Sequence, residues 1–472
     1  MGVSLNPATL LSGQGIDVSS LVNQLLAKNS GQLTEWQTEQ YTLQSQATAL
    51  NSINNDLTSL ATAMTALSDP LGAITAQAAT SSNSGVLTAT AQTTALPGNH
   101  SIVVTSLASA GTVYTNDFAG GASASILPTG ATTGEIDLQI GGATGATHAI
   151  TITKGSNDTL TTLAKYINGQ NLGVNASVVT DANGSRLALV SQNTGVPGAP
   201  AITSNNTSLS FAGPTGGANA VLTIDGIPYE SATNTITGAI PGVTLNLAGS
   251  SSGNPVQVMV GPDATQATGA VNNFVAAYNQ VINDINQQFA VNTATNSEGP
   301  LGSDSSLRQL QSSLMADVTY AIPGNTGGYA NLSALGISMN DDGTLAVDST
   351  QLSSALSSNP SGFVSFFQNA TQTGFADTFH KDLTNLTNPT QGVLTLDLTQ
   401  NQAQQLNLTT SINSFEARLT AEQTQLTTEF NQVNASLQAY PLLLQEVTAT
   451  LGTMSSGGGN NTSSSPILTS GL

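Results

Sequence analysis

The residue types that most often carry catalysis or bind metals are few in this sequence and lie far apart. The chain has three histidines, His100, His148 and His380. They fall in three different regions and show none of the spacings of a zinc site, so each is predicted to be a surface or edge residue. The segment 340–343, Asn-Asp-Asp-Gly, is similar to part of a calcium loop. However, Ser338 stands where such a loop has its first carboxylate and Ser349 where it has its bidentate glutamate. A turn is therefore the better interpretation.

Motifs for nucleophilic catalysis and for phosphate binding are also missing from the sequence. No Gly-x-Ser-x-Gly elbow and no glycine-rich loop joins an expected strand to an expected helix, and no pair of carboxylates is framed by aromatic residues. The chain contains no cysteine, which excludes disulfides, thiolate metal sites and thiol nucleophiles. The sequence therefore predicts no catalytic, cofactor-binding or metal-binding residue, and its information concerns architecture and assembly.

The charge of the chain is low in density and strongly acidic in balance. Charged residues make up 7% of the 472 residues, and the formal net charge is −20. The seven cations are scattered, at Lys28, Lys154, Lys165, Arg186, Arg308, Lys381 and Arg418. Without a basic patch, the chain is not expected to bind nucleic acid or to insert into a membrane. No apolar run approaches the length of a membrane span, and the first residues lack the features of a Sec signal, so export would take another route.

A long amphipathic helix is predicted near the end of the chain, from about residue 406 to 451. Its apolar residues recur at steps of three and four, at Ile412, Phe415, Leu419, Leu426, Phe430, Val433, Leu437, Tyr440, Leu444, Val447 and Leu451. Glu422 interrupts this stripe and introduces a stutter into the heptad pattern. Pro441 is expected to kink the helix at Tyr440 unless the first turn of a new helix begins there.

Such a stripe needs a partner, because each large apolar side chain left in water forgoes roughly 1.5–3 kcal/mol. The best candidate is a strict seven-residue repeat near the other end of the chain, formed by Trp36, Leu43, Leu50, Leu57 and Met64. We predict that the two helices pair as a coiled-coil stem, with the 50–57 region against the 419–430 region. The alternative is that they are two unrelated amphipathic helices of a helical domain.

Between these helices the sequence alternates between strand and helix patterns. Strands are expected at 85–91, 101–105, 135–140, 149–153, 174–180, 186–191, 220–225, 242–247 and 256–260. A helix over 160–167, capped by Asn157 or Asp158, lies among the strands of a small α+β module. Hairpin turns are expected at 181–184 and 340–343. The fold class is therefore α+β and multidomain, with β-rich head domains inserted between the two stem helices.

The domain boundaries follow from these changes of pattern. The expected units are a flexible N-terminal arm with a short helix (1–33), an N-terminal stem helix (34–72), the first part of head domain A (73–130), an inserted head domain B (131–218), the second part of head domain A (219–264), a helical stem domain with a hairpin at 337–347 and the C-terminal coiled-coil helix (265–441), and a C-terminal leg with a flexible tail (442–472).

In their order along the chain, these motifs closely resemble those of the bacterial flagellar filament cap family, the hook-associated protein 2 family. The resemblance begins at Gly15-Ile16-Asp17 with its following leucines and continues through residues 79–90 and 97–104. Head domain B is similar to the flagellin hook repeat unit, in which Asp158-Thr159-Leu160 opens the helix. Further matches are residues 224–226, 240–245, 274–279, 299–308, 335–337 and 342–345. Pro441 and the glycine-rich tail depart from the family's uninterrupted closing helix.

The resemblance implies a structural protein at the distal tip of the flagellum. Such a protein would be exported through the flagellar type III channel and would close into a homo-oligomeric ring, often of five copies. The ring would retain exported flagellin and promote its folding and polymerisation. The implied partners are other copies of the chain, flagellin, the hook-filament junction proteins and an export chaperone.

The terminal segments would form a leg that contacts neighbouring copies or the filament. Alone they are predicted to be mobile, since short isolated helices are marginal in water. The expected leg residues are Ile16, Val18, Leu21, Leu25, Leu444, Val447 and Leu451. Two other classes of function were weighed: an extracellular adhesin that binds surface or host ligands through the heads, and an enzyme, which the missing motifs disfavour.

Overall fold

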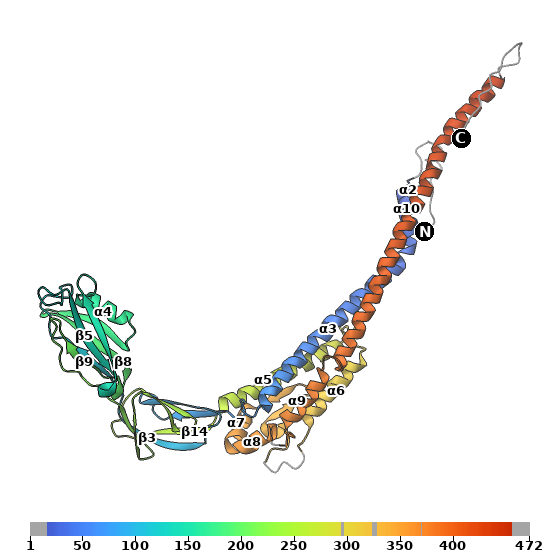
Figure 1. The fold of residues 1–472 in the computed structure, drawn as a ribbon. Coiled ribbons are helices and arrows are strands. Elements are labelled where there is room, and N and C mark those ends of the chain that lie inside the picture. Colours follow the sequence, from blue (N-terminus) through green and yellow to red (C-terminus); the bar gives the residue numbers. More distant parts are fainter. Residues whose placement is uncertain (1–16, 294–296, 323–327, 370, 456–472) are drawn as a thin grey trace.

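The computed structural model describes residues 17–293, 297–322, 328–369 and 371–455, and Figure 1 shows an elongated molecule. A long helical stem leads into a helical domain, and two β-rich units, head A and head B, follow beyond it. The first helices, α2 and α3, and the last helix, α10, form the stem, so the heads are inserted between them, as the sequence pattern predicts.

The N-terminal side of the stem consists of two helices that follow one another almost without interruption. The short helix α2 (Val18–Asn29) begins where the Asp17 carboxylate accepts a hydrogen bond of 3.1 Å from the amide of Ser20. It is followed by α3 (Gly31–Ser68). The residue between them, Ser30, has helical backbone angles, so Gly31 begins the second helix and does not break the first. The helix ends before Pro70, as expected.

The C-terminal side of the stem is the single helix α10 (Val393–Ser455). Pro441 lies inside it, so the new helix considered from the sequence does not start there and no helix end marks a domain boundary at residue 441. A proline removes one amide donor from a helix. The side chains around this position are largely exposed, so water can reach the carbonyl left without a partner.

The two chain ends pair, but in a different register from the one predicted. Trp36 of α3 packs edge-on against Phe415 of α10, with ring centroids 5.5 Å apart, and Leu43 packs with Leu408 and Ile412. This register runs antiparallel, so later residues of α10 meet α2. The prediction that the 50–57 region faces 419–430 is therefore wrong.

The second half of α3 is covered by other helices. Leu50, Leu57 and Met64 belong to the core of the helical domain, together with residues of α5 (Ala264–Phe289) and α9 (Phe375–Leu386). A seven-residue repeat requires an apolar cover but does not say which helix provides it, and the sequence analysis assigned the whole repeat to one partner.

The rest of the helical domain packs around a cluster of aromatic rings. Its other elements are α6 (Ser305–Thr319), a 3-10 helix η3 (Leu332–Leu335), the hairpin of β15 (Ile337–Met339) and β16 (Leu345–Val347), α7 (Ser349–Ser358) and α8 (Pro360–Phe367). The rings of Phe274 and Phe375 meet edge-on at 5.7 Å, and those of Phe366 and Phe375 stack at 5.5 Å. The hairpin turn at 340–343 is as expected, whereas α9 was not predicted from the sequence.

Head A consists of two antiparallel sheets that face each other across one core. Its strands are β1 (Gln77–Ser81), β2 (Leu87–Ala91), β3 (Gly98–Ser106), β10 (Ala220–Ile224), β11 (Ile227–Ser231), β12 (Thr235–Ile240), β13 (Val243–Leu247) and β14 (Val256–Pro262). One sheet has the order β1-β14-β3-β10-β11 and the other β12-β13-β2. Alternate residues such as Ile102, Leu222, Leu245 and Val258 fill the core between them.

Head B contains two three-stranded sheets and one helix. Its elements are β4 (Ala110–Tyr114), β5 (Thr133–Ile140), η1 (Gly142–Thr144), β6 (Ala146–Thr153), α4 (Leu160–Gly169), β7 (Val174–Asp181), β8 (Gly184–Thr194), η2 (Val196–Gly198) and β9 (Pro200–Asn205). The sheet orders are β4-β8-β7 and β6-β5-β9. Leu160, Leu163 and Ile167 of α4 are buried in the shared core.

Two predictions about head B need correction. First, β4 pairs with β8, and Val113 and Ile126 lie in the core of head B, so this unit begins at about Ala110 and not at residue 131. The glycine- and alanine-rich composition of this stretch concealed the strand. Second, the cap of α4 is Thr159, whose hydroxyl accepts a hydrogen bond of 3.2 Å from the amide of Thr162.

No helix within the described residue ranges is long and apolar enough to cross a membrane.

Two carboxyl groups in the helical domain are partly buried close to other acids. The Oδ2 atoms of Asp56 and Asp317 have no hydrogen-bond partner in the described part of the chain. Burial, followed by the hydrogen bond and charge of Asp284 on α5, raises the pKa of Asp56 to about 6. Burial and the negative charge of Asp382 on α9 raise the pKa of Asp317 to about 7. Both groups therefore keep a proton to a higher pH in the folded domain than an exposed aspartate does.

These pKa values predict that the helical domain loses stability as the pH rises from about 4 to about 7. In that range the folded chain keeps a proton on Asp317 that the unfolded chain, with a pKa near 3.8, releases. The carboxyl group of Asp317 is partly exposed, which weakens the effect. The free energy of unfolding of the helical domain should therefore be about 1–2 kcal/mol higher near pH 5 than near pH 8. Urea unfolding followed by far-ultraviolet circular dichroism would measure this.

The matched variants for that measurement are D317N and D341N. The first should remove most of the pH dependence, because an amide does not titrate. The second changes an exposed aspartate of the hairpin turn and should preserve the pH dependence. A D317N protein whose stability still fell between these pH values as in the unmodified chain would contradict the assignment to Asp317.

The register of the stem can be tested by disulfide formation. The chain has no cysteine of its own, so an engineered pair is unambiguous. The double variant L43C/L408C joins two residues of one buried cluster and should oxidise readily, giving a band of altered mobility on a non-reducing gel. The control L50C/L426C should not cross-link within one chain. Cross-linking of the control pair but not of the first pair would restore the register predicted from the sequence.

Candidate assembly interface

The predicted stem residues fall into three groups along the structure. Trp36, Leu43, Ile412 and Phe415 form the direct contact between α3 and α10. Leu50, Leu57 and Met64 are buried in the helical domain instead. The remaining predicted residues lie farther along α10: Leu419, Leu426, Phe430 and Leu437 are half-buried, and Val433 is exposed. The structure thus brings four of the twelve together as the two-helix contact between α3 and α10.

A layer of neutral amides lies beside this apolar contact. Asn401 is only 6% exposed, and its side chain donates to Gln46 Oε1 at 3.3 Å and accepts from Gln405 Nε2 at 2.6 Å. The same Gln405 amide reaches the backbone carbonyl of Leu43 at 3.3 Å. Buried amides of this kind fix the register of paired helices, because a shifted register would leave them without partners. The sequence analysis missed them because it followed apolar positions alone.

The predicted leg residues near the N-terminus face the other stem helix. Val18 and Leu21 are 7% and 8% exposed, and α2 packs along α10. Leu25 is 37% exposed and therefore remains partly available. Ile16 lies outside the described residues. The short helix is thus formed and packed against α10 within one chain, and the mobility predicted for the terminal segments stays a prediction.

The predicted leg residues near the C-terminus are in a different environment. Leu444, Val447 and Leu451 are 50%, 53% and 60% exposed on the last turns of α10. Their spacing of three and four residues places them on one face of the helix, and Leu443 and Tyr440 nearby are exposed as well. A run of large apolar side chains in water marks a surface for association. Its role as the leg interface stays a prediction.

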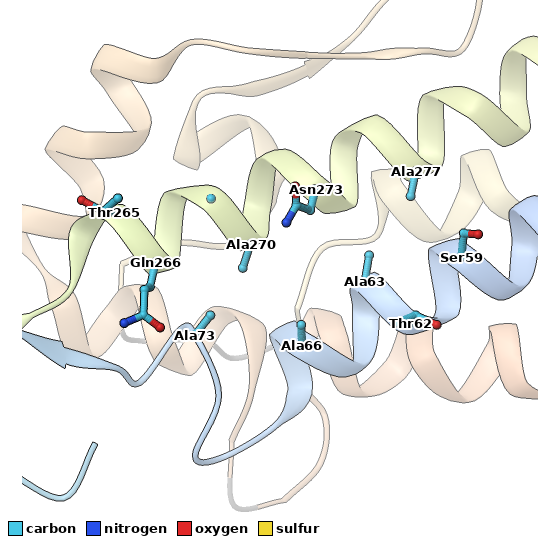
Figure 2. Close-up of a pocket in the computed structure, with 11 residues that line it drawn as sticks. Ser59, Thr62, Ala63, Ala66, Ala73, Thr265, Gln266, Ala270, Asn273 and Ala277 are labelled. Atoms are coloured by element: carbon cyan, nitrogen blue, oxygen red, sulfur yellow. The ribbon is translucent and has the colours of Figure 1, made fainter. Parts of the chain in front are cut away.

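The helical domain also carries a shallow groove of about 590 Å³ between α3 and α5. Figure 2 shows that its lining consists mostly of small side chains, among them Ala63 and Ala66 of α3 and Ala270 and Ala277 of α5. Ala73, in the segment that leads to head A, closes one end of it. The groove contains no charged residue, so it offers no group for acid–base chemistry.

The residues first considered for chemistry have structural surroundings. His100 Nδ1 lies 2.8 Å from Asp225 Oδ2, and this contact lowers the pKa of Asp225. Asp225 and Gly226 have positive φ angles and form the turn between β10 and β11. The contact between His100 and Asp225 therefore supports this hairpin turn. Asp342 accepts hydrogen bonds from the amide and hydroxyl of Thr344, as expected of a turn. Within the described ranges no three histidine, aspartate or glutamate side chains gather in a group that could hold a metal ion.

Comparison with known families identifies the architecture. The N-terminal model of flagellar hook-associated protein 2 matches residues 14–111, and the C-terminal model of the same family matches residues 217–440. Between them, the flagellin hook IN motif matches residues 137–193, inside head B. These matches confirm the family resemblance found in the sequence.

Individual relatives match over nearly the whole chain. The B-type flagellar hook-associated protein 2 of Pseudomonas aeruginosa is 30% identical over 477 residues, which cover 94% of this chain and 98% of the relative. The flagellar hook-associated protein 2 of Escherichia coli K12 is 27% identical over a match that covers 89% of this chain and 93% of that relative. The crystal structure of the D1-D2-D3 domains of the flagellar cap protein FliD from Escherichia coli matches with a TM-score of 0.57 and 27% identity, covering 75% of this chain and 99% of that one. The chain belongs to the flagellar hook-associated protein 2 family.

Proposed function

We propose that copies of this chain form a ring at the distal tip of the flagellar filament, held there by the exposed end of α10. The chain is a filament cap by family, and in that role it retains exported flagellin and promotes its polymerisation. The observation that carries the proposal for the leg is the apolar face of Leu444, Val447 and Leu451, which the single chain leaves in water.

The different shapes of the two ends of the molecule support this proposal. The stem is narrow and ends in an uncovered apolar helix, whereas the heads are broad and lie at the opposite end (Figure 1). A segment that inserts between other helices has to be narrow, whereas a plate that covers a channel has to be broad. We propose that the stem contacts the filament and that the heads form the plate.

The finer assignments are also proposals. We propose a ring of five copies, with flagellin and the hook-filament junction proteins as its structural partners and an export chaperone as a transient one. Secretion through the flagellar export channel is compatible with a chain that lacks cysteine, because no disulfide has to form after export. The family role is structural, and we propose that the chain is not an enzyme. The adhesin alternative gains no support from the matched families or relatives.

The assignment can be tested by complementation. The host is a flagellated bacterium, related to the source of this chain, from which the gene for its own cap protein has been deleted. The unmodified chain should restore filaments and keep flagellin out of the medium. The triple variant L444S/V447S/L451S should leave the thermal unfolding of the chain unchanged, since these side chains are already exposed, but should abolish filament growth.

A control for that experiment is Q445S/T448S/T450S, which changes polar residues in the same turns and should complement fully. Failure of the unmodified chain to support filaments would count against the cap role. Normal filaments with the triple apolar variant would count against the leg interface alone, so the two conclusions can be separated.

Ring formation should depend on salt because each copy carries a formal charge of −20. Repulsion between copies is screened over ~8 Å at physiological ionic strength but extends over ~30 Å at 0.01 M salt. Rings should therefore dissociate at low ionic strength, as measured by sedimentation velocity at constant protein concentration. Sucrose in place of salt should not restore them. Equal or tighter association at low salt would show that charge does not limit the assembly.

A further inference from the structure

Heads A and B have separate hydrophobic cores. The core of head A includes Ile102 and Leu245, the core of head B includes Leu138 and Leu187, and the two clusters share no residue. The chain passes from head A to head B after β3 and returns before β10. Separate cores joined by two chain segments often move relative to one another, so the contacts at this crossing decide whether they do.

The two crossing segments form a ribbon that keeps one antiparallel register. In head A, β3 pairs with β10 from Ile102 opposite Ile224 to Ser106 opposite Val221. Beyond these strands, Ser109 pairs with Ala218 through hydrogen bonds of 2.9 and 3.2 Å. Farther into head B, Thr112 pairs with Thr215 through bonds of 2.9 and 2.8 Å. Isolated pairs therefore keep the register of β3 and β10 from one head into the other.

Side chains brace this ribbon from a third direction. Asn234, in the loop after β11 of head A, accepts a hydrogen bond of 2.8 Å from the amide of Ala108 and donates one of 3.0 Å to its carbonyl. Thr194, at the end of β8 in head B, donates from its hydroxyl to the carbonyl of Ala232 at 2.6 Å. The amide of Gly195 donates to the carbonyl of Ser109 at 3.0 Å. Together these residues tie the ribbon, head A and head B at one place.

Glycines allow the close packing of this seam. A β-carbon at Gly217 would lie 2.3 Å from the carbonyl oxygen of Gly195, and one at Gly195 would lie 2.7 Å from the Cα of Ala232. Both distances are far below van der Waals contact, so the backbones approach as closely as glycine permits. A seam packed backbone against backbone leaves little room for one head to turn against the other.

At the crossing between head A and the helical domain, the two segments are paired as β1 and β14 up to Gln77 opposite Pro262, and α5 begins directly after Asp263. The segment after Asp69 leads into β1, and β14 leads into α5. Next to α5, the amide of Asp263 donates a hydrogen bond of 2.8 Å to the carbonyl of Ala76 and so joins the two segments. Ile74 anchors the first segment in the helical core. Beside it lies the open groove lined by Ala73 and Gln266 (Figure 2), which leaves space next to the crossing.

We propose that heads A and B form one rigid arm, locked by the seam of Asn234, Thr194 and Gly217, and that the arm changes direction at the crossing between residues 69–76 and Asp263. Contacts made by head B are then transmitted to the helical domain as a rotation of the whole arm. Head B does not swing independently of head A.

The cysteine-free chain allows a direct test by double electron–electron resonance. One pair of spin labels, at T88C and T151C, spans the seam from an exposed strand of head A to an exposed strand of head B. A second pair, at T88C and S353C, spans the crossing to α7. The seam pair should give one narrow distance distribution, and the crossing pair a broader one. A seam pair as broad as the crossing pair would overturn the rigid arm.

Variants show whether the seam is the cause. N234A and, separately, T194V should broaden the distribution of the seam pair and leave that of the crossing pair unchanged. The matched control N99A removes an amide contact to Gln257 on an exposed part of head A and should change neither. Narrow seam distributions in both N234A and T194V would overturn the assignment to these residues. A crossing pair as narrow as the seam pair would overturn the placement of the motion.

Discussion

The apolar stripe of α3 is the constraint on which the rest of the structure depends. No single partner covers its whole length: α10 covers its first half through Leu408 and Ile412, and α5 and α9 cover its second half. Each uncovered residue would forgo roughly 1.5–3 kcal/mol, which is large against the net stability of a domain. The middle and the end of the chain must therefore both return to α3. The heads are inserted between α3 and the first of these returns, α5, and this arrangement produces the nested order of helices and strands.

Side-chain amides of asparagine hold together elements that ion pairs often connect in more highly charged proteins. Asn168 bonds the amide and the carbonyl of Ala176 at 2.7 and 2.8 Å, and Asn279 does the same for Leu345 at 2.6 and 2.8 Å. Asn234 repeats this arrangement at the seam. A carboxamide has both a donor and an acceptor, so one side chain can replace a missing strand neighbour without a charge. This explains how a chain with 7% charged residues can hold its elements together.

The fold class, the pairing of the chain ends and most strands of the heads could be predicted from the sequence, because each depends on a local period of apolar residues. The register of the stem could not, since the repeat of α3 continues past Leu50 while its partner changes there. The strand β4 escaped notice because its residues, Ala-Gly-Thr-Val-Tyr, are mostly small. In the candidate interface, the apolar faces were predictable, but Asn401 and Gln405 were not, because a buried polar residue in a helix is recognised only once its partner is known.

The antiparallel contact of the stem also dictates an order of events in folding. Gln40 and Thr409, which share a hydrogen bond of 3.0 Å, are 369 positions apart in the chain. Closing so long a loop costs conformational entropy that rises with the logarithm of its length, and each compact head that has already formed shortens the effective loop. Heads A and B, which depend on contacts nearer in sequence, therefore fold before the stem closes. When the chain is synthesised from its N-terminus, the first half of the α3 stripe therefore stays uncovered until α10 has been made, and the complete stem forms only with this final helix.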